Sequence, residues 1–391
     1  MVTYIHRTRF MAKILFISGI EIFPPLSGGQ LRSSNLTNEL SKNHEVEIYS
    51  FTGRKQDYLN FKKSSTSVIN QNLKEYTNRH PFWGVIQFIF YQIKLPPIWL
   101  TFILSFYLPK DLKNKLKNAD TIILDFPFLY PIFKYRTKAR KIINTHNAEY
   151  QLYQNNILVK LVKNIEEKSF RIADKVIFCS ENDMQKFNIE SLQHKSLIIP
   201  NGIDLIKYQA KDESKNNQLK KELAIDNQHT IFIFTGSKYY PNQIAVEKLK
   251  EFAKENENYL LKNNIIILIV GSVGDEFKNE KTIKITGKVD SIIPYLQISH
   301  FALNNIEIGS GTNVKMFEYI ATELVILSTE FGTRGFQLVS DTDYIKFDQN
   351  YLTTFQQAIS LNSDEKKAIT KSAFNKNEHL LSMTKYLKDI T

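Results

Sequence analysis

The 391-residue sequence contains one cysteine and no cluster of cysteine and histidine at the spacing of a zinc site. A single thiol, Cys179, excludes an internal disulfide and a cysteine-based metal cage, and it suits a reducing compartment. Cys179 ends an apolar run and no matching base accompanies it, so we interpret it as a buried structural residue and not as a nucleophile.

An apolar run long enough to span a membrane is also missing. A spanning helix needs roughly 20 apolar residues, and Lys94, Pro96 and Pro97 divide the most apolar segment, residues 81–109, into two shorter pieces. One interpretation is two helices packed on a sheet; the other is an aromatic-rich surface that rests in the membrane interface. The N-terminus lacks a signal-peptide pattern, so we expect a cytoplasmic protein, peripheral to the inner face of the membrane in the second interpretation.

Acidic residues are too few to balance the basic ones, and the formal net charge is +11. Such a charge favours anionic partners. The lysines are scattered, and no recognition-helix, zinc-finger or RNA-binding pattern is present, so we expect no nucleic-acid partner. The remaining partners are phosphate-bearing small molecules and an anionic membrane surface.

Short apolar runs alternate with longer amphipathic segments along the whole chain. This alternation predicts parallel sheets with crossover helices. The series begins at "KILFISG" and starts again at "TIFIFTGS", after a polar stretch over residues 210–228. We therefore predict an α/β protein with two Rossmann-like domains, over residues 11–198 and 199–370, and a C-terminal helix over 371–391 that packs back on the N-terminal domain.

The segment "GSGTNVKMFEY", Gly309 to Tyr319, is a tight turn between a predicted strand and a predicted helix. Small residues let backbone N–H groups approach an anion, and the helix dipole adds positive character there. Lys315 supplies a full charge, and Glu318 lies on the same helical face. The segment is not a Walker A loop. Taken alone, the segment is better interpreted as a plain turn.

Other segments that carry polar residues and glycine occur in a distinctive order: "PPLSGGQLR", "NTHNAEY", "PNGID", "SKYYPN" and "TEFGTRG". Together with "GSGTNVKMFEY" they resemble the retaining glycosyltransferases of family 4, which have the GT-B fold. The resemblance extends from the first strand to Phe336. It implies that the two domains face a central cleft, with the acceptor bound by the N-terminal half and a nucleotide-sugar donor by the C-terminal half.

The resemblance also implies roles for individual residues. Glu318 would accept hydrogen bonds from the ribose hydroxyls, and the amides around the glycine turn, with Lys315, would face the diphosphate. Ser310 stands where many members have a glutamate near the donor sugar, which leaves the identity of the sugar open. Lys238 is the nearest candidate for the family's basic phosphate clamp. The expected donor-binding residues are Gly28, Gly29, Gly236, Lys238, Gly309, Ser310, Gly311, Thr312, Asn313, Lys315 and Glu318.

His146 ends a predicted strand, where catalytic groups of doubly wound sheets cluster. A histidine there could equally satisfy local backbone groups; the resemblance places it near the transferred sugar, so His146 and Glu318 are the predicted catalytic residues. Glu149 either orients the loop or opens a helix. Asp341-Thr342-Asp343 looks like a metal-binding Asp-x-Asp element, but it falls in a polar stretch where a surface loop is expected, so no metal and no cofactor are predicted.

These observations predict a hexosyltransferase that acts in polysaccharide or surface-glycan biosynthesis, on a glycan or lipid-linked acceptor. Two alternatives remain open at this point. One is an epimerase or hydrolase that acts on a free nucleotide sugar on the same fold. The other is a non-catalytic GT-B-like subunit that binds a glycan or a partner enzyme.

Overall fold

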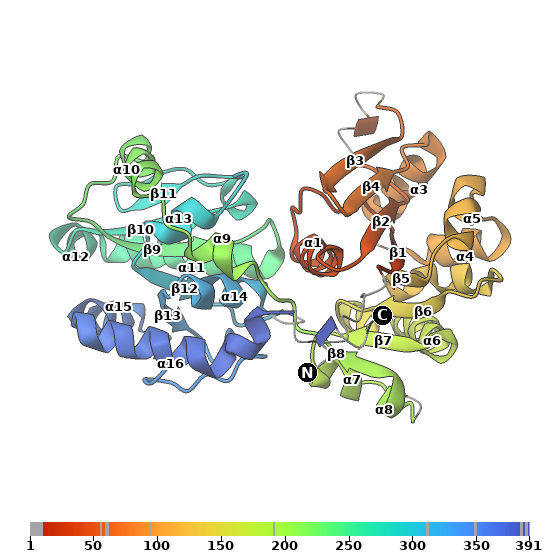
Figure 1. The fold of residues 1–391 in the computed structure, drawn as a ribbon. Coiled ribbons are helices and arrows are strands. Elements are labelled where there is room, and N and C mark those ends of the chain that lie inside the picture. Colours follow the sequence, from red (N-terminus) through yellow and green to blue (C-terminus); the bar gives the residue numbers. More distant parts are fainter. Residues whose placement is uncertain are drawn as a thin grey trace, which may run out of the picture. The chain divides into compact units, whose positions relative to one another are not determined.

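The computed structural model describes residues 11–54, 57–58, 62–93, 95–190, 192–309, 313–347, 350–383, 386–387 and 390. The chain divides into two compact units (Figure 1): Met1–Gly202 with Met383–Thr391, here called the first domain, and Ile203–Ser382, the second domain. The division therefore falls at Gly202, where the sequence predicted residue 198.

The first domain is built on an eight-stranded sheet in the order β3-β4-β2-β1-β5-β6-β7-β8. All neighbouring strands are parallel except β3 and β4. The strands are β1 (Lys13–Ser18), β2 (Glu45–Ser50), β3 (Ser65–Asn70), β4 (Leu73–Thr77), β5 (Thr121–Asp125), β6 (Arg140–Asn144), β7 (Lys175–Phe178) and β8 (Ser196–Ile198).

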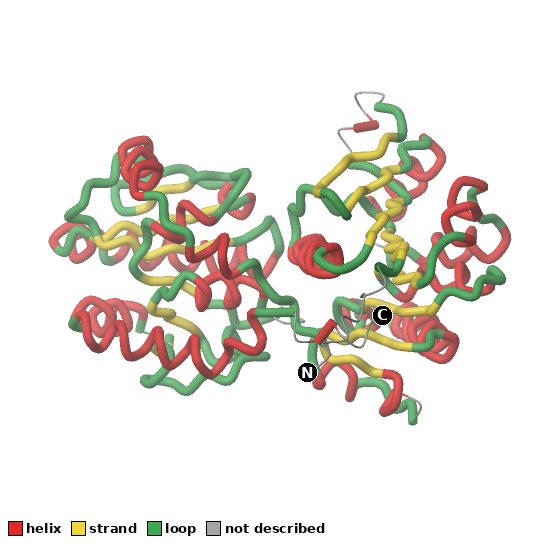
Figure 2. The backbone as a smooth tube through the Cα atoms, viewed as in Figure 1, coloured by secondary structure: helices red, strands yellow, loops and turns green. Residues whose placement is uncertain are grey.

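Helices cover both faces of this sheet (Figure 2). Because both faces are buried, the central strands are continuously apolar, and alternate residues serve different cores. Leu15 and Ile17 of β1 belong to one apolar cluster, and Ile14 and Phe16 to the other. The helices are α1 (Gly28–Ser41), α3 (Pro81–Gln92), α4 (Ile98–Phe106), α5 (Lys110–Lys117), α6 (Asn156–Ile172), α7 (Glu181–Gln185) and α8 (Leu192–Lys195), with 3₁₀ turns η1 (Pro127–Lys134) and η2 (Glu149–Leu152).

The second domain has a six-stranded sheet in the order β11-β10-β9-β12-β13-β14, parallel throughout. Its strands are β9 (Thr230–Thr235), β10 (Ile265–Val270), β11 (Ile283–Ile285), β12 (Phe301–Asn304), β13 (Val325–Ser328) and β14 (Ile345–Lys346). Its helices are α9 (Leu205–Gln209), α10 (Glu213–Glu222), α11 (Tyr240–Glu255), α12 (Glu257–Lys262), α13 (Ile293–Gln297), α14 (Val314–Ala321), α15 (Tyr351–Ser360) and α16 (Ser363–Leu381), with the 3₁₀ turn η3 (Ser272–Gly274).

The apolar segment at residues 81–109 forms two helices, α3 and α4. One side of the pair is core: Trp83, Trp99 and Leu104 are at most 5% exposed. The other side is open to solvent, where Phe102 is 69% and Phe106 82% exposed. Within the described residues, no helix combines the length and the apolar character that crossing a bilayer requires.

The C-terminal helix differs from its predicted bounds. α16 begins at Ser363 and ends at Leu381, and it packs on α14 and β13 of the second domain. The residues after it return to the first domain, where Met383 and Ile390 join the apolar cluster of Phe16 and Leu36. The backbone carbonyl of Ile390 accepts a hydrogen bond of 3.0 Å from Arg140 Nη1.

Candidate functional site

Each sheet has one point where the strand order reverses, between β1 and β5 in the first domain and between β9 and β12 in the second. In open parallel sheets, ligands bind at the carboxyl ends of the strands at such points. The residues predicted from the sequence lie in the segments that follow these strands: Gly28 and Gly29 after β1, His146 after β6, Gly236 and Lys238 after β9, and Gly309 after β12.

His146 is held by a carboxylate in the first domain. Its Nε2 lies 2.7 Å from Oδ1 of Asp125, the last residue of β5, and its ring stacks on Phe126 with 4.2 Å between centroids. The side chain is almost fully buried. Nδ1 has no hydrogen-bond partner among the described residues. The imidazole is therefore fixed at one nitrogen, while the other is buried without a hydrogen-bond partner in the described part of the chain.

Gly29 faces that second nitrogen. It belongs to the first turn of α1, which Ser27 caps by accepting a hydrogen bond from the amide of Gln30. A methyl group at position 29 would lie 3.1 Å from Nδ1 of His146. A larger residue at position 29 would therefore crowd Nδ1, and the helix N-terminus adds positive character beside it.

Asp125 is itself fixed by two further side chains. Ser33 Oγ donates to Oδ2 at 2.8 Å, and Asn144 Nδ2 donates to Oδ1 at 2.8 Å. Arg32 in turn donates to Asn144 Oδ1 at 3.2 Å. Sequence reasoning missed this supporting set. The available signal was the polar residue that ends each buried strand, Asp125 on β5 and Asn144 on β6.

Among the described residues, Glu149 forms no hydrogen bond with His146, although its carboxyl group is near the Asp125 charge. It opens η2, and its amide donates to Glu166 Oε1 at 2.8 Å. Burial raises the pKa of Glu149 to about 7, although a hydrogen bond from Asn147 lowers it. The loop is thus held by Glu166, a carboxylate on α6 whose pKa burial raises to about 8.

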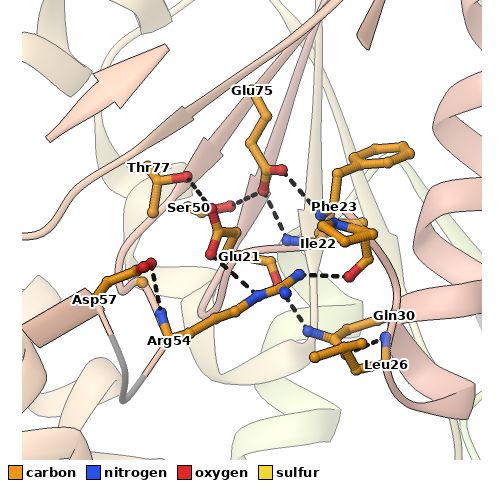
Figure 3. Close-up of polar contacts among 12 residues, drawn as sticks. Glu21, Ile22, Phe23, Leu26, Gln30, Ser50, Arg54, Asp57, Glu75 and Thr77 are labelled. Atoms are coloured by element: carbon orange, nitrogen blue, oxygen red, sulfur yellow. Dashed lines mark hydrogen bonds and ion pairs between the residues drawn. The ribbon is translucent and has the colours of Figure 1, made fainter. Parts of the chain in front are cut away.

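The loop between β1 and Gly28 is held by buried carboxylates (Figure 3). Glu75 on β4 accepts the amides of Ile22 and Phe23 at 2.7 and 3.0 Å. Glu21 pairs with Arg54 and Arg79, with shortest separations of 3.3 and 2.8 Å. Burial raises the pKa of both Glu21 and Glu75. These bonds fix the path of the loop that delivers the glycines to His146.

In the second domain, Gly309 has a φ of +143°, a conformation that favours glycine. The predicted residues Ser310, Gly311 and Thr312 lie outside the described residues. Asn313 follows them and is buried; its Nδ2 donates to Asn304 Oδ1 at 2.9 Å and to the carbonyl of Gly332 at 3.3 Å. The turn is therefore anchored at its end to the carboxyl end of β12.

Lys315 lies in the first turn of α14 and is buried. Its Nζ donates to Asn242 Oδ1 at 3.1 Å and lies 3.8 Å from the centroid of the Phe234 ring. Burial lowers the pKa of Lys315 to about 7, while the nearby Glu318 carboxylate raises it. An anionic ligand beside this ammonium group would stabilise its charged form.

Glu318 is equally buried, one turn along α14. Tyr208 donates a hydrogen bond of 3.2 Å to its Oε1. Burial raises the pKa of Glu318 to about 7, while Tyr208 and the Lys315 charge lower it. A carboxylate in such a site can accept hydrogen bonds from a diol, because its own partners are few.

Lys238 is not part of this buried pair. It is half exposed and forms an ion pair with Glu276 on the surface. Arg334, in "TEFGTRG", lies closer to the turn: its Nη2 is 3.3 Å from where a methyl group on Gly309 would be. Sequence reasoning named the segment but missed this cation. Lys238 stays a prediction, and Arg334 joins it as a candidate for contacting phosphate.

Three further predicted features are placed by the structure. Gly236 lies against a second glycine, since a methyl group on Gly271 would come within 2.3 Å of the Gly236 carbonyl oxygen. Cys179 is buried and its thiol donates to the carbonyl of His146 at 3.1 Å. Asp343 is in a turn, as expected, but it is buried and bound to Lys376 at 2.6 Å, so it is not a surface residue.

Two mainly parallel α/β sheets, each with one strand reversal point, are the architecture of the GT-B class of glycosyltransferase folds, and solved structures of that class match nearly the whole chain. Anabaena Alr3699/HepE, solved with UDP and glucose, is 12% identical, with a TM-score of 0.65 over 97% of this chain and 98% of its own. The α,α-trehalose-phosphate synthase of Burkholderia xenovorans, solved with glucose-6-phosphate, is 10% identical, with a TM-score of 0.67 over 96% and 98%. WaaG, a glycosyltransferase involved in lipopolysaccharide biosynthesis, is 13% identical, with a TM-score of 0.61 over 97% and 99%.

Comparison of the sequence with protein-family models gives one match. Residues 27–207, most of the first domain, match the model of Glycosyltransferase Family 4. No curated protein matches the chain. The resemblance inferred from the sequence and the predicted fold class are thus confirmed: residues 27–207 match the family model, and the whole chain has the GT-B fold.

Proposed function

We propose that this protein is a retaining glycosyltransferase that moves a hexose from a nucleoside-diphosphate-sugar donor to a glycan or lipid-linked acceptor during surface-glycan synthesis. The observation that carries the proposal is the buried pair on α14. Lys315 and Glu318 place a cation and a carboxylate one helical turn apart, behind a glycine turn at the strand reversal point. Diphosphate and ribose are two ligand groups with that complementary chemistry.

The chemistry asked of these residues is mainly electrostatic. Departure of the nucleoside diphosphate builds negative charge on its phosphate oxygens. The Lys315 ammonium, the amides at the start of α14 and the Arg334 guanidinium are fixed donors that stabilise that charge without reorganising. No step of this proposal uses a metal ion, so we expect transfer to continue in EDTA.

In the first domain, the proposed role of His146 is to contact the transferred sugar. With Nε2–H donating to the Asp125 carboxylate, Nδ1 is the nitrogen that can accept a hydrogen bond from a sugar hydroxyl. Asp125 is a positioning residue in this scheme. The charge of +11 and the exposed apolar side of α3 and α4 support a place at the inner face of the membrane.

The test is direct binding of UDP-, GDP- and ADP-sugars to wild type, to Glu318→Gln and to a surface control, Glu307→Gln, in the same domain. We expect one nucleotide class to bind wild type and the control, with affinity about 10-fold lower or more for Glu318→Gln, because a charged hydrogen-bond acceptor is lost. Hydrolysis of the bound donor, followed alone and with added acceptors, separates a transferase from a hydrolase. Absence of binding by wild type would refute the proposal.

A further inference from the structure

The first domain contains a groove of about 1880 Å³ beside α3, which the sugar site does not use. It lies between α3, the start of α5 and the segment that follows β4. Small-molecule sites usually occupy about 300–1,000 Å³. The groove, here called the α3 groove, therefore has room for a ligand longer than a sugar or a nucleotide.

Its lining is strongly apolar on the α3 side. Phe82, Val85 and Phe88 line it and are each about half exposed, between 47% and 57%. Ile103 of α4 and Tyr107 extend the same surface, and Trp83 contributes from the core. Large apolar side chains gathered in one hollow mark a binding surface more often than a plain surface.

Basic groups accompany these apolar residues. Lys62, Lys63, Arg79, His80 and Lys110 line the groove, against one carboxylate, Asp111. Asp57 holds Lys62 at 2.9 Å and Arg79 at 3.0 Å. Within the described part of the chain, no salt bridge involves Lys63 or Lys110. The groove thus combines an apolar wall with two lysines able to bind an anion, the charge pattern complementary to a lipid phosphate.

We propose that the α3 groove binds one molecule of a lipid-phosphate acceptor, its hydrocarbon chain against Phe82, Val85 and Phe88 and its phosphate beside Lys63 and Lys110. This inference rests on the proposed transferase function and specifies the acceptor class. An ion pair links the groove to the loop between β1 and Gly28: Arg79 lines the groove and pairs at 2.8 Å with Glu21 of that loop. An acceptor held here lies in the same domain as the proposed sugar-contacting histidine.

The experiment measures binding of farnesyl phosphate, below its aggregation concentration, to the full-length protein by calorimetry. The matched variants are Val85→Glu and Ile89→Glu. Both positions are on α3 and about half exposed, but Ile89 does not line the groove. We expect Val85→Glu to weaken binding at least 10-fold and Ile89→Glu to leave it within twofold of wild type. Lys63→Ala with Lys110→Ala should weaken it several-fold, and inorganic phosphate alone should bind far more weakly.

Equal binding of farnesyl phosphate by Val85→Glu and Ile89→Glu would overturn the proposal, as would absence of farnesyl phosphate binding by wild type.

A parallel assay with vesicles of phosphatidylglycerol and phosphatidylcholine tests the competing occupant, a bilayer surface. If both variants lose vesicle binding while neither loses farnesyl phosphate, α3 contacts a membrane and the groove is not the acceptor site. Binding of UDP-glucose to the same proteins distinguishes failure of the proposed function from failure of this inference. If wild type does not bind UDP-glucose, the proposed transferase function is refuted. If wild type binds UDP-glucose but Val85→Glu does not weaken farnesyl phosphate binding, only the assignment of the α3 groove is refuted. Circular dichroism confirms folding of each variant.

Discussion

Lys315 and Glu318 are ionisable groups that burial moves from opposite sides to a pKa of about 7. Below that pH, Glu318 takes up a proton and loses its charge as an acceptor for ribose. Above it, Lys315 loses its proton and its attraction for the diphosphate. The affinity for donor should therefore be greatest near pH 7 and fall on both sides.

Each side of that profile is expected to depend on one residue. Lys315→Met should lower the affinity at pH 7 by about 10-fold or more and abolish the alkaline decline; Glu318→Gln should abolish the acidic decline. Lys248→Met is the control, because Lys248 pairs on the surface with Glu307, which raises its pKa. Calorimetry from pH 5.5 to 9 in matched buffers measures both limbs. A profile unchanged by either substitution would contradict the assignment.

Asp125 offers a second prediction at this scale. Asp125→Asn keeps an oxygen for Asn144 and His146 but removes the negative charge beside Nε2. Since hydrogen bonds to charged groups contribute about 1.5–3 kcal/mol, we expect kcat to fall about 10-fold or more while KM for the donor changes little. Steady-state rates with a working acceptor and their pH profile are the measurement. Ser33→Ala, which removes a neighbouring bond and no charge, should cost less; an equal loss would point to a structural role.

The sequence predicts the residues of the second-domain pair because both stand at fixed positions on one short helix. It predicts His146 because a strand ends just before it. It does not predict Asp125, Ser33 or Asn242, whose contacts join elements far apart in the chain. Ser33 and Asp125, for example, are 92 positions apart. Such contacts depend on strand order, which alternating apolar runs do not determine.

Among the elements, the strand β4 carries a structural carboxylate that supports the loop after β1. Glu75 is 1% exposed and accepts two amides and the Ser50 hydroxyl. Glu75→Gln would replace one acceptor oxygen by a donor that faces an N–H group. We expect a loss of about 1–3 kcal/mol in the free energy of unfolding, measured by urea denaturation. Glu45→Gln, exposed on β2, is the control and should change stability by less than about 0.5 kcal/mol.

β3 and β8 show where sequence patterns fail to reveal a strand. β3 is almost entirely exposed, so "STSVIN" lacks the alternation that marks a half-buried strand. β8 has three residues, too few for any period. The central strands were predictable for the opposite reason, since burial on both faces requires apolar residues at every position. For residues 81–109 the sequence left two packed helices and a membrane-interface surface as alternatives; the structure shows two helices, α3 and α4, with one side buried and the other exposed.

For the whole molecule, the last residues are predicted to stabilise the first domain. Ile390 is fully buried in its core. Ile390→Ala should lower the stability of that domain by about 2–4 kcal/mol, or less if the segment detaches first. Both tryptophans of the chain, Trp83 and Trp99, are in the first domain, so their fluorescence reports its unfolding alone. Ile157→Ala, 76% exposed on α6, should leave the transition in place; a shift as large as that of Ile390→Ala would contradict the assigned role.

The chain leaves the first domain at Gly202 and returns to it at Met383. The outgoing and returning segments contact each other in both domains. In the second domain, the Ile203 amide donates to the Leu381 carbonyl at 2.8 Å; in the first, a methyl group on Gly202 would come within 2.5 Å of Met383. During synthesis, domains near the N-terminus commonly fold first. Here the order of completion is reversed: the second domain is whole once residue 382 has emerged from the ribosome, while the first is complete only after Ile390 has followed.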